Sequence, residues 1–122
     1  MMQKIVLAFL LLISFYNYSQ KKLKIPPYLK KGDTVAIVCT ARKFMPEDAK
    51  PAIELLESWA LKAKLGRTIG LDSCQLGGTD AERIADFQEM MDDDNIKAIW
   101  CARGGYGTVR IIDSLDFTKF KK

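Results

Sequence analysis

A short apolar run followed by three closely spaced glycines constrains this chain more than any other stretch. Residues 98–102 are apolar and include bulky side chains, which predicts a buried strand. Gly104, Gly105 and Gly107 then break the pattern, and residues 108–114 have the apolar spacing of a short helix. A strand, a glycine turn and a helix start often bind ligands in open α/β sheets, because the helix N-terminus presents unpaired N–H groups. A tight turn that binds nothing is the alternative.

Two nucleotide-binding patterns fail at this turn. The dinucleotide pattern G-x-G-x-x-G lacks a third glycine after Gly107, and no Gly-Lys-Ser/Thr follows to form a phosphate loop. Tyr106, inside the turn, instead favours packing against a substrate or a neighbouring loop. A nucleotide-binding α/β domain is therefore the weakest of the functional hypotheses.

Length and charge narrow the class of protein further. The 122 residues suffice for one small domain with a modest core. The net charge of +4 comes from dispersed lysines and arginines, not from a dense basic stripe with aromatic residues, so nucleic acid is not an expected partner. The chain has no histidine, and its cysteine spacing matches no zinc pattern. We expect neither a metal nor a cofactor.

Cysteines and acidic residues offer two weaker signals. Cys39, Cys74 and Cys101 cannot all pair within one chain. Cys39 and Cys101 lie near the ends of apolar strand-like runs, which predicts buried free thiols, although an exported protein could form a disulfide. The acidic run at residues 92–94 could bind a metal, but a solvated helix end and turn is the preferred interpretation.

The first residues are typical of a secretory signal peptide. Lys4 precedes an apolar run at residues 5–15, and a polar segment at residues 17–20 follows it. The run is too short for a comfortable membrane span, so we expect no membrane span once residues 1–19 are removed. A buried N-terminal strand or helix is the alternative. We expect export to the periplasm, from a Gram-negative cytoplasm, of a mature domain covering residues 20–122.

The mature chain then reads as alternating strands and helices. Pro26 and Pro27 favour an extended lead-in, and residues 34–39 form a continuous β-branched apolar run that suits a strand covered on both faces. Residues 40–43 follow its carboxyl end, where ligands often bind. Apolar residues at helical spacing predict a helix over residues 46–63, with Trp59 in the core. Because Pro51 removes a helix hydrogen bond, either this helix begins near Lys50 or its first turn is distorted.

The second half repeats the same order of elements. Residues 62–65 suit a short strand, and Thr79 with Glu82 forms a capping-box pattern that begins an amphipathic helix. The strand at residues 96–102 then leads into the glycine turn. We predict a small three-layer α/β domain with a parallel, Rossmann- or flavodoxin-like sheet. Residues 34–39 and 96–102 should be its central strands, each buried on both faces.

These segments together resemble the N-terminal part of the LD-carboxypeptidase family of serine peptidases, which includes murein tetrapeptide carboxypeptidases and microcin-immunity peptidases. The most specific matching piece is Arg-Gly-Gly-Tyr-Gly at residues 103–107. The other pieces occur in family order and cover nearly all of Pro26 to Asp116; they are residues 26–38, 55–59, 78–80 with Arg83, 98–102 and 115–116.

The resemblance implies release of a terminal D-amino acid from a murein stem peptide by a serine nucleophile and a Glu–His pair, without a metal. The serine lies in a Gly-x-Ser-Asp motif shortly after the Leu-Asp that matches Leu115-Asp116. We expect all three residues beyond Lys122. The serine should lie shortly after it, and the Glu and the His should belong to a C-terminal domain that is absent here. Ser58, Ser73 and Ser114 have no histidine to activate them, and we interpret all three as structural or solvated.

This chain therefore offers no catalytic residue of its own. Its candidate site is the loop Gly104, Gly105, Tyr106 and Gly107, which could present N–H groups to the substrate or to an oxyanion. We expect the isolated chain to be an inactive, truncated N-terminal portion whose uncovered apolar surface favours self-association, such as a homodimer. A genuine short module that binds a cell-wall peptide without cleaving it is the alternative.

Overall fold

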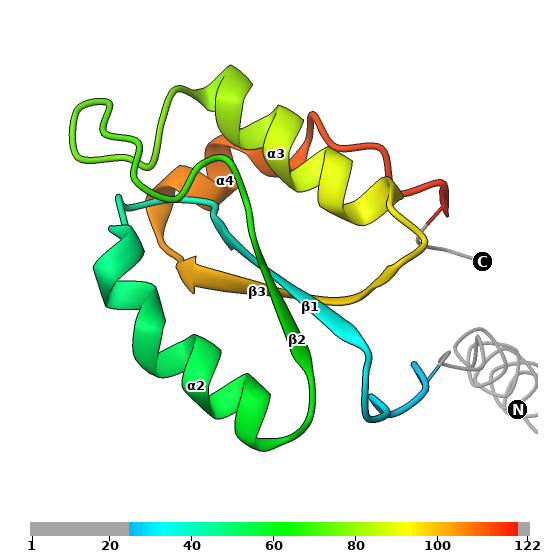
Figure 1. The fold of residues 1–122 in the computed structure, drawn as a ribbon. Coiled ribbons are helices and arrows are strands. Elements are labelled where there is room, and N and C mark those ends of the chain that lie inside the picture. The colour runs from blue at the N-terminus through cyan, green and yellow to red at the C-terminus, as the bar shows by residue number, and fades with distance from the viewer. Residues whose placement is uncertain (1–24, 120–122) are drawn as a thin grey trace, which may run out of the picture.

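Three parallel strands form the centre of the molecule in a computed structural model that describes residues 25–119. β1 (Thr34–Cys39) lies between β2 (Lys62–Leu65) and β3 (Ile96–Arg103). Figure 1 shows α2 (Lys50–Ser58) on one face of the sheet and α3 (Asp80–Asp92) with α4 (Tyr106–Ile112) on the other. The predicted α/β fold with a parallel sheet is confirmed, whereas the predicted signal peptide at residues 1–19 lies outside the described residues.

Strand β1 supplies most of the core because both of its faces are covered. Successive side chains of a strand point to opposite faces, so alternate residues of β1 enter two separate clusters. The cluster on the α2 side contains Val35, Ile37, Leu56 and Leu61. The cluster on the α3 side contains Ala36, Val38 and Met90. The prediction that residues 34–39 form a central strand covered on both faces is confirmed. None of the helices in residues 25–119 is long and apolar enough to cross a membrane.

Strand β3 differs from its prediction. It runs parallel to β1 as expected, but it lies at an edge of the three-stranded sheet and alternates between half-buried and exposed residues. Helix α2 packs against β2, at the opposite edge, and Trp100 on β3 is left 38% exposed. The prediction that residues 96–102 form a central strand buried on both faces is therefore wrong. Continuous apolar sequence does not reveal which strand the helices leave uncovered.

The end of α2 also differs from its prediction, and the backbone shows why. The helix ends at Ser58, five residues before the predicted Ala63. Ala60 adopts a left-handed conformation with φ of 59°, its N–H donates to the Glu57 carbonyl at 2.8 Å, and the Leu61 N–H donates to the Leu56 carbonyl at 3.0 Å. This pair of bonds is a Schellman motif, which normally has glycine where Ala60 stands.

The Schellman motif decides which side chains enter the core. Leu56 and Leu61 come together in the α2-side cluster, whereas Trp59 leaves the helix face and is 58% exposed. The prediction that Trp59 belongs to the core is therefore wrong. Without a glycine at position 60, the sequence carried no signal that the helix stops there.

Two predicted helix starts are confirmed. A 3₁₀ turn, η1 (Pro46–Ala49), precedes α2, and the α-helix proper begins at Lys50. This is the first of the two interpretations of Pro51 given above. At α3, the Thr79 side chain accepts from the Glu82 N–H at 3.3 Å, and the Glu82 carboxylate accepts from the Thr79 N–H at 2.7 Å. This reciprocal capping box fixes the start of α3.

We predict that Ala60→Gly stabilises the protein. A left-handed conformation costs an L-residue roughly 1–2 kcal/mol, whereas the extra freedom of glycine in the unfolded chain costs about 0.4–1 kcal/mol. The free energy of unfolding in urea should therefore rise by about 0.5–1 kcal/mol. Ala85→Gly, at an exposed position within α3, is the matched control and should lower it by about 1 kcal/mol. A loss of stability in Ala60→Gly would contradict this account of the helix end.

The three cysteines differ in exposure, and this predicts their reactivity. Cys39 at the end of β1 is buried, and burial raises the pKa of its thiol to about 11. Cys74 and Cys101 are exposed, so the buried-thiol prediction is confirmed for Cys39 and wrong for Cys101, which lies on the edge strand. Because only the thiolate is nucleophilic, two thiols of native protein should react with a disulfide reagent at pH 8 and the third only in denaturant. Rapid modification of three thiols in the native protein would contradict this prediction. Cys39→Ala is the control and should show the same two rapidly reacting thiols.

Candidate functional site

The carboxyl ends of β1 and β3 lie side by side and form the natural place for a ligand. Cys39 pairs with Arg103 in the register of these two parallel strands. From β1 the chain turns toward α2 on one face of the sheet, and from β3 it turns toward α4 on the other (Figure 1). In open α/β sheets, ligands bind at such a switch point, beside the carboxyl ends of the strands. The switch point brings residues 40–43 and the glycine loop 104–107 together, two segments that the sequence analysis singled out separately.

Each glycine of the loop stands in a different environment. Gly105 has a φ of 134°, which side chains of L-residues rarely adopt. A Cβ on Gly107 would lie 2.7 Å from the Ala41 Cα and 2.7 Å from the Arg83 Nη1, so backbone of the neighbouring loop excludes any side chain there. A Cβ on Gly104 would meet no atom of the described residues within 4 Å, and its φ is not positive. Backbone conformation therefore explains Gly105 and close packing explains Gly107, whereas the space around Gly104 is open.

Arg83 of α3 holds the two loops in place. Its side chain is fully buried, and its Nη1 donates to the carbonyls of Thr40 at 2.6 Å and of Gly107 at 2.8 Å. Its Nε donates to the Gly78 carbonyl at 3.2 Å, and its Nη2 donates to Asp80. A buried charge is tolerated only when it is paired and hydrogen-bonded, and these four acceptors meet that requirement.

Two further contacts extend this network. Asp80 also accepts from Arg110 of α4, at 2.6 Å from Nη2 and 3.0 Å from Nε. The hydroxyls of Thr40 and Thr108 lie 2.8 Å apart and share a hydrogen bond between the end of β1 and the start of α4. The start of α4 is thus bonded both to the end of β1 and to the start of α3, which fixes the glycine loop from two sides.

A second buried charge, Asp86, fixes the loop that follows β2. Its carboxylate accepts from the N–H groups of Arg67 at 3.0 Å and Thr68 at 2.9 Å, and from the Thr68 hydroxyl at 2.5 Å. The Thr68 Oγ1 in turn accepts from the Cys39 N–H at 2.9 Å. This chain of bonds links α3 to the end of β1, so its role is structural.

Sequence reasoning missed both buried charges. Arg83, Asp86 and Met90 share the buried face of α3. Arg83 was named from the sequence only as a piece that matches the family, and Asp86 was not named. The available signal was their spacing of three and four residues, which places two charges on the same helix face as apolar residues.

Other predicted residues occupy less specific surroundings. Tyr106 is the first residue of α4 and is 77% exposed, with Val109 and Ile112 of the same helix also exposed. The Ser58 hydroxyl donates to the Leu55 carbonyl at 2.6 Å, an ordinary bond within a helix. Apolar side chains are thus uncovered beside the glycine loop.

The acidic run at residues 92–94 forms the end of α3 and the following turn. Asp93 accepts from the Asn95 N–H and from the Lys64 Nζ, both at 2.9 Å. These bonds, the backbone one first, lower the pKa of Asp93 to about 2. Within the described part of the chain, no three His, Cys, Asp or Glu side chains gather in a group that could hold a metal ion.

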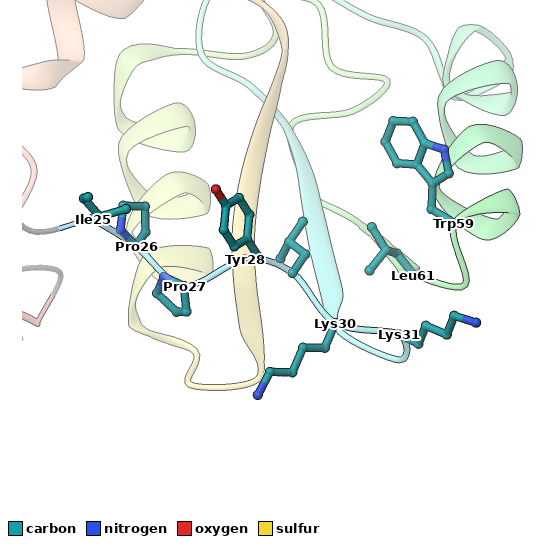
Figure 2. Close-up of a pocket in the computed structure, with 9 residues that line it drawn as sticks. Ile25, Pro26, Pro27, Tyr28, Lys30, Lys31, Trp59 and Leu61 are labelled. Carbon is teal, nitrogen blue, oxygen red and sulfur yellow. The ribbon is translucent and has the colours of Figure 1, made fainter.

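A separate hollow of about 610 Å³ lies at the amino-terminal end of the sheet. Figure 2 shows it between the lead-in segment, residues 25–31, and Trp59 with Leu61. Its lining contains no carboxylate, serine, threonine or cysteine side chain. Because ligands of parallel sheets bind at the carboxyl ends of the strands, the switch point beside the glycine loop remains the candidate site.

Most of the chain matches a known protein family. Residues 35–122 match the family model described as the LD-carboxypeptidase N-terminal domain. The chain belongs to the LD-carboxypeptidase family. A probable murein peptide carboxypeptidase of Bacillus subtilis is 41% identical over 97 residues, which cover 80% of this chain and 30% of the relative. A murein tetrapeptide carboxypeptidase of Pseudomonas aeruginosa is 29% identical, over 71% of this chain and 28% of its own length.

Solved structures share the fold of this LD-carboxypeptidase domain. An MccF-like protein from Bacillus anthracis superposes with a TM-score of 0.71 at 22% identity, over 81% of this chain and 31% of that one. A muramoyltetrapeptide carboxypeptidase from Oxalobacter formigenes gives a TM-score of 0.59 at 26% identity, over 70% of this chain and 28% of that one. The chain spans about 30% of the length of the curated relatives it matches.

We predict that Gly107→Ala destabilises this LD-carboxypeptidase domain and Gly104→Ala does not. The new methyl group at position 107 must displace the backbone of Ala41, which should lower the free energy of unfolding by about 1–3 kcal/mol. The methyl group at position 104 enters open space, so its effect should stay within about 0.5 kcal/mol. Urea denaturation of both variants checks the difference. Equal stability of the two would show that the loop is not packed against Ala41.

Proposed function

We propose that this chain is the N-terminal part of a serine-type LD-carboxypeptidase that releases a terminal D-amino acid from murein stem peptides. The observation that carries the proposal is the 41% identity to a probable murein peptide carboxypeptidase. The proposed division of the chain is a signal peptide at residues 1–19 and an N-terminal α/β domain at residues 20–122. With such a signal peptide the enzyme would act in the periplasm, where murein peptides are accessible.

In this proposal the loop Gly104, Gly105, Tyr106 and Gly107 serves the substrate or the oxyanion. The N–H groups of Tyr106 and Gly107 begin α4 and have no acceptor within that helix. N–H donors fixed in advance stabilise charge that develops on a carbonyl oxygen in the transition state. The bonds from Arg83 and Thr40 to this segment support the proposal, because they hold the donors in one arrangement before the substrate binds.

The nucleophile and its base must come from elsewhere. The chain has no histidine, so none of its serines has an imidazole partner. We propose that the serine, the Glu and the His belong to chain that follows residue 122, which agrees with the coverage of about 30% of the relatives' length. A module that binds a cell-wall peptide without cleaving it is the second candidate function, supported by the same lack of a nucleophile–base pair.

We predict that the 122-residue chain alone does not release D-alanine from a murein tetrapeptide. Loss of nucleophile and base together typically lowers turnover on the order of a millionfold. The measurement is chromatographic detection of D-alanine against a no-protein control. Release that is abolished by Ser73→Ala or Ser114→Ala would contradict the prediction and place the nucleophile within this chain.

A chimera tests the two candidate functions against each other. Residues 35–119 replace the matching segment of the Bacillus subtilis relative, and the unmodified relative is the positive control. If the domain supports catalysis, the chimera releases D-alanine, and Gly105→Val in the chimera lowers turnover more than it weakens substrate binding. A folded chimera without activity, whose unmodified parent is active, would favour the binding module.

A further inference from the structure

Two arginines face one hollow beside the candidate site. Arg42 follows β1 and Arg103 ends β3, so the switch point brings them together from positions 61 residues apart in sequence. The hollow has a volume of about 320 Å³. It is lined by Arg42, Lys43, Met45, Asp48, Gln75 and Arg103.

The charges around this hollow do not balance. Lys43 is paired with Asp72, at 2.5 Å between Nζ and Oδ2. No ion pair formed among residues 25–119 involves Arg42 or Arg103, and Asp48 is the one carboxylate that lines the hollow. A guanidinium keeps its charge throughout the physiological pH range. The hollow therefore has an excess of positive charge that an anionic ligand would neutralise.

The frame around the two arginines is fixed by backbone bonds. The backbone of Arg42 forms an isolated antiparallel β-bridge with Leu76, and the Lys43 N–H donates to the Gln75 carbonyl at 3.0 Å. Gln75 has a φ of 70°, a strained conformation for a residue other than glycine. Arg103 is held over the Phe44 ring, with its Cζ 5.9 Å from the centroid. The backbone that carries both arginines is therefore fixed before a ligand binds, which lowers the entropic cost of ordering the site.

The chemistry of the arginines points to a carboxylate. A guanidinium donates two parallel N–H bonds to a planar carboxylate, and such charge-assisted pairs are about twice as strong as neutral hydrogen bonds. The substrate of any carboxypeptidase ends in a free α-carboxylate next to the bond that is cleaved. Arg103 immediately precedes Gly104, the loop glycine whose surroundings are open.

We propose that Arg42 and Arg103 bind the terminal carboxylate of the peptide substrate. This inference rests on the proposed function, because it identifies the group that the substrate presents beside the glycine loop. Binding there would hold the carboxyl end of the peptide at Arg103, which adjoins the glycine loop in sequence, and would select peptides with a free carboxyl end over amidated ones.

Binding to the intact 122-residue chain tests the inference directly. The probes are acetyl-L-lysyl-D-alanine and its C-terminal amide, titrated by NMR in low-salt buffer. The acid should bind at least tenfold more tightly than the amide. Arg42→Gln and Arg103→Gln should each weaken binding of the acid at least tenfold, and Arg103→Lys should weaken it too, because the lysine keeps the charge but loses the planar fork.

Arg67→Gln is the matched control, since it removes the same charge from an exposed arginine paired with Glu89 outside the hollow. It should leave binding unchanged, and circular dichroism establishes that each variant is folded. Equal binding of acid and amide, no binding of the acid, or an equal loss in Arg67→Gln would overturn the inference. Tighter binding of inorganic phosphate than of the acid would overturn it as well, since the hollow would then be a phosphate site.

The chimera separates this inference from the proposed function. Arg103→Gln in an active chimera should raise KM at least tenfold, and an unchanged KM would overturn the arginine inference alone. An inactive chimera together with arginine-dependent binding of the acid would overturn the proposed catalytic role while retaining the carboxylate site.

Discussion

The arrangement of the candidate site depends on one buried guanidinium. Arg83 lies at 0% exposure within α3 and bonds to the ends of three separate segments, at Gly78, Thr40 and Gly107. A charge moved out of water must recover its lost hydration from acceptors that are already in place, and removing a partner of a buried charge costs about 3–5 kcal/mol. The loops after β1 and β3 therefore cannot move independently of α3. The hydrogen bond from Arg83 to the Gly107 carbonyl both pairs the buried charge and fixes the glycine loop.

This dependence explains how a small sheet can hold the glycine loop in one arrangement. Only β1 is covered on both faces, and β3 lies at an edge with Trp100 partly exposed. The sheet alone would leave the turn at residues 104–107 attached at one end. Polar bonds from α3, through Arg83, and from Arg110 to Asp80 supply the second attachment. The bonds of Arg83 are buried, so water competes with them weakly, whereas Arg110 is exposed and its pair with Asp80 contributes less.

The same geometry gives different roles to the arginine that positions the loops and to the two arginines that line the hollow. The guanidinium of Arg83 is buried and bonded to backbone carbonyls, so it cannot bind a ligand, whereas Arg42 and Arg103 line a hollow. Three arginines around one switch point thus have different chemistry, although the sequence presents them as equivalent residues. In a family of carboxypeptidases, a fixed donor loop beside an excess of positive charge suits a peptide that ends in a carboxylate.

The sequence by itself determined the strand at residues 34–39, the start of α3 at Thr79, the glycine turn and the family, because each rests on local pattern or motif. Tertiary structure alone decided that α2 stops at Ser58, that residues 96–102 lie at an edge, and that Arg83 and Asp86 are buried. The physical reason is that burial depends on which distant segments pack together. Helical spacing identifies residues that share one helix face, but it does not reveal whether backbone groups or water will contact that face. Likewise, Arg42 and Arg103 become neighbours only through the parallel pairing of β1 and β3.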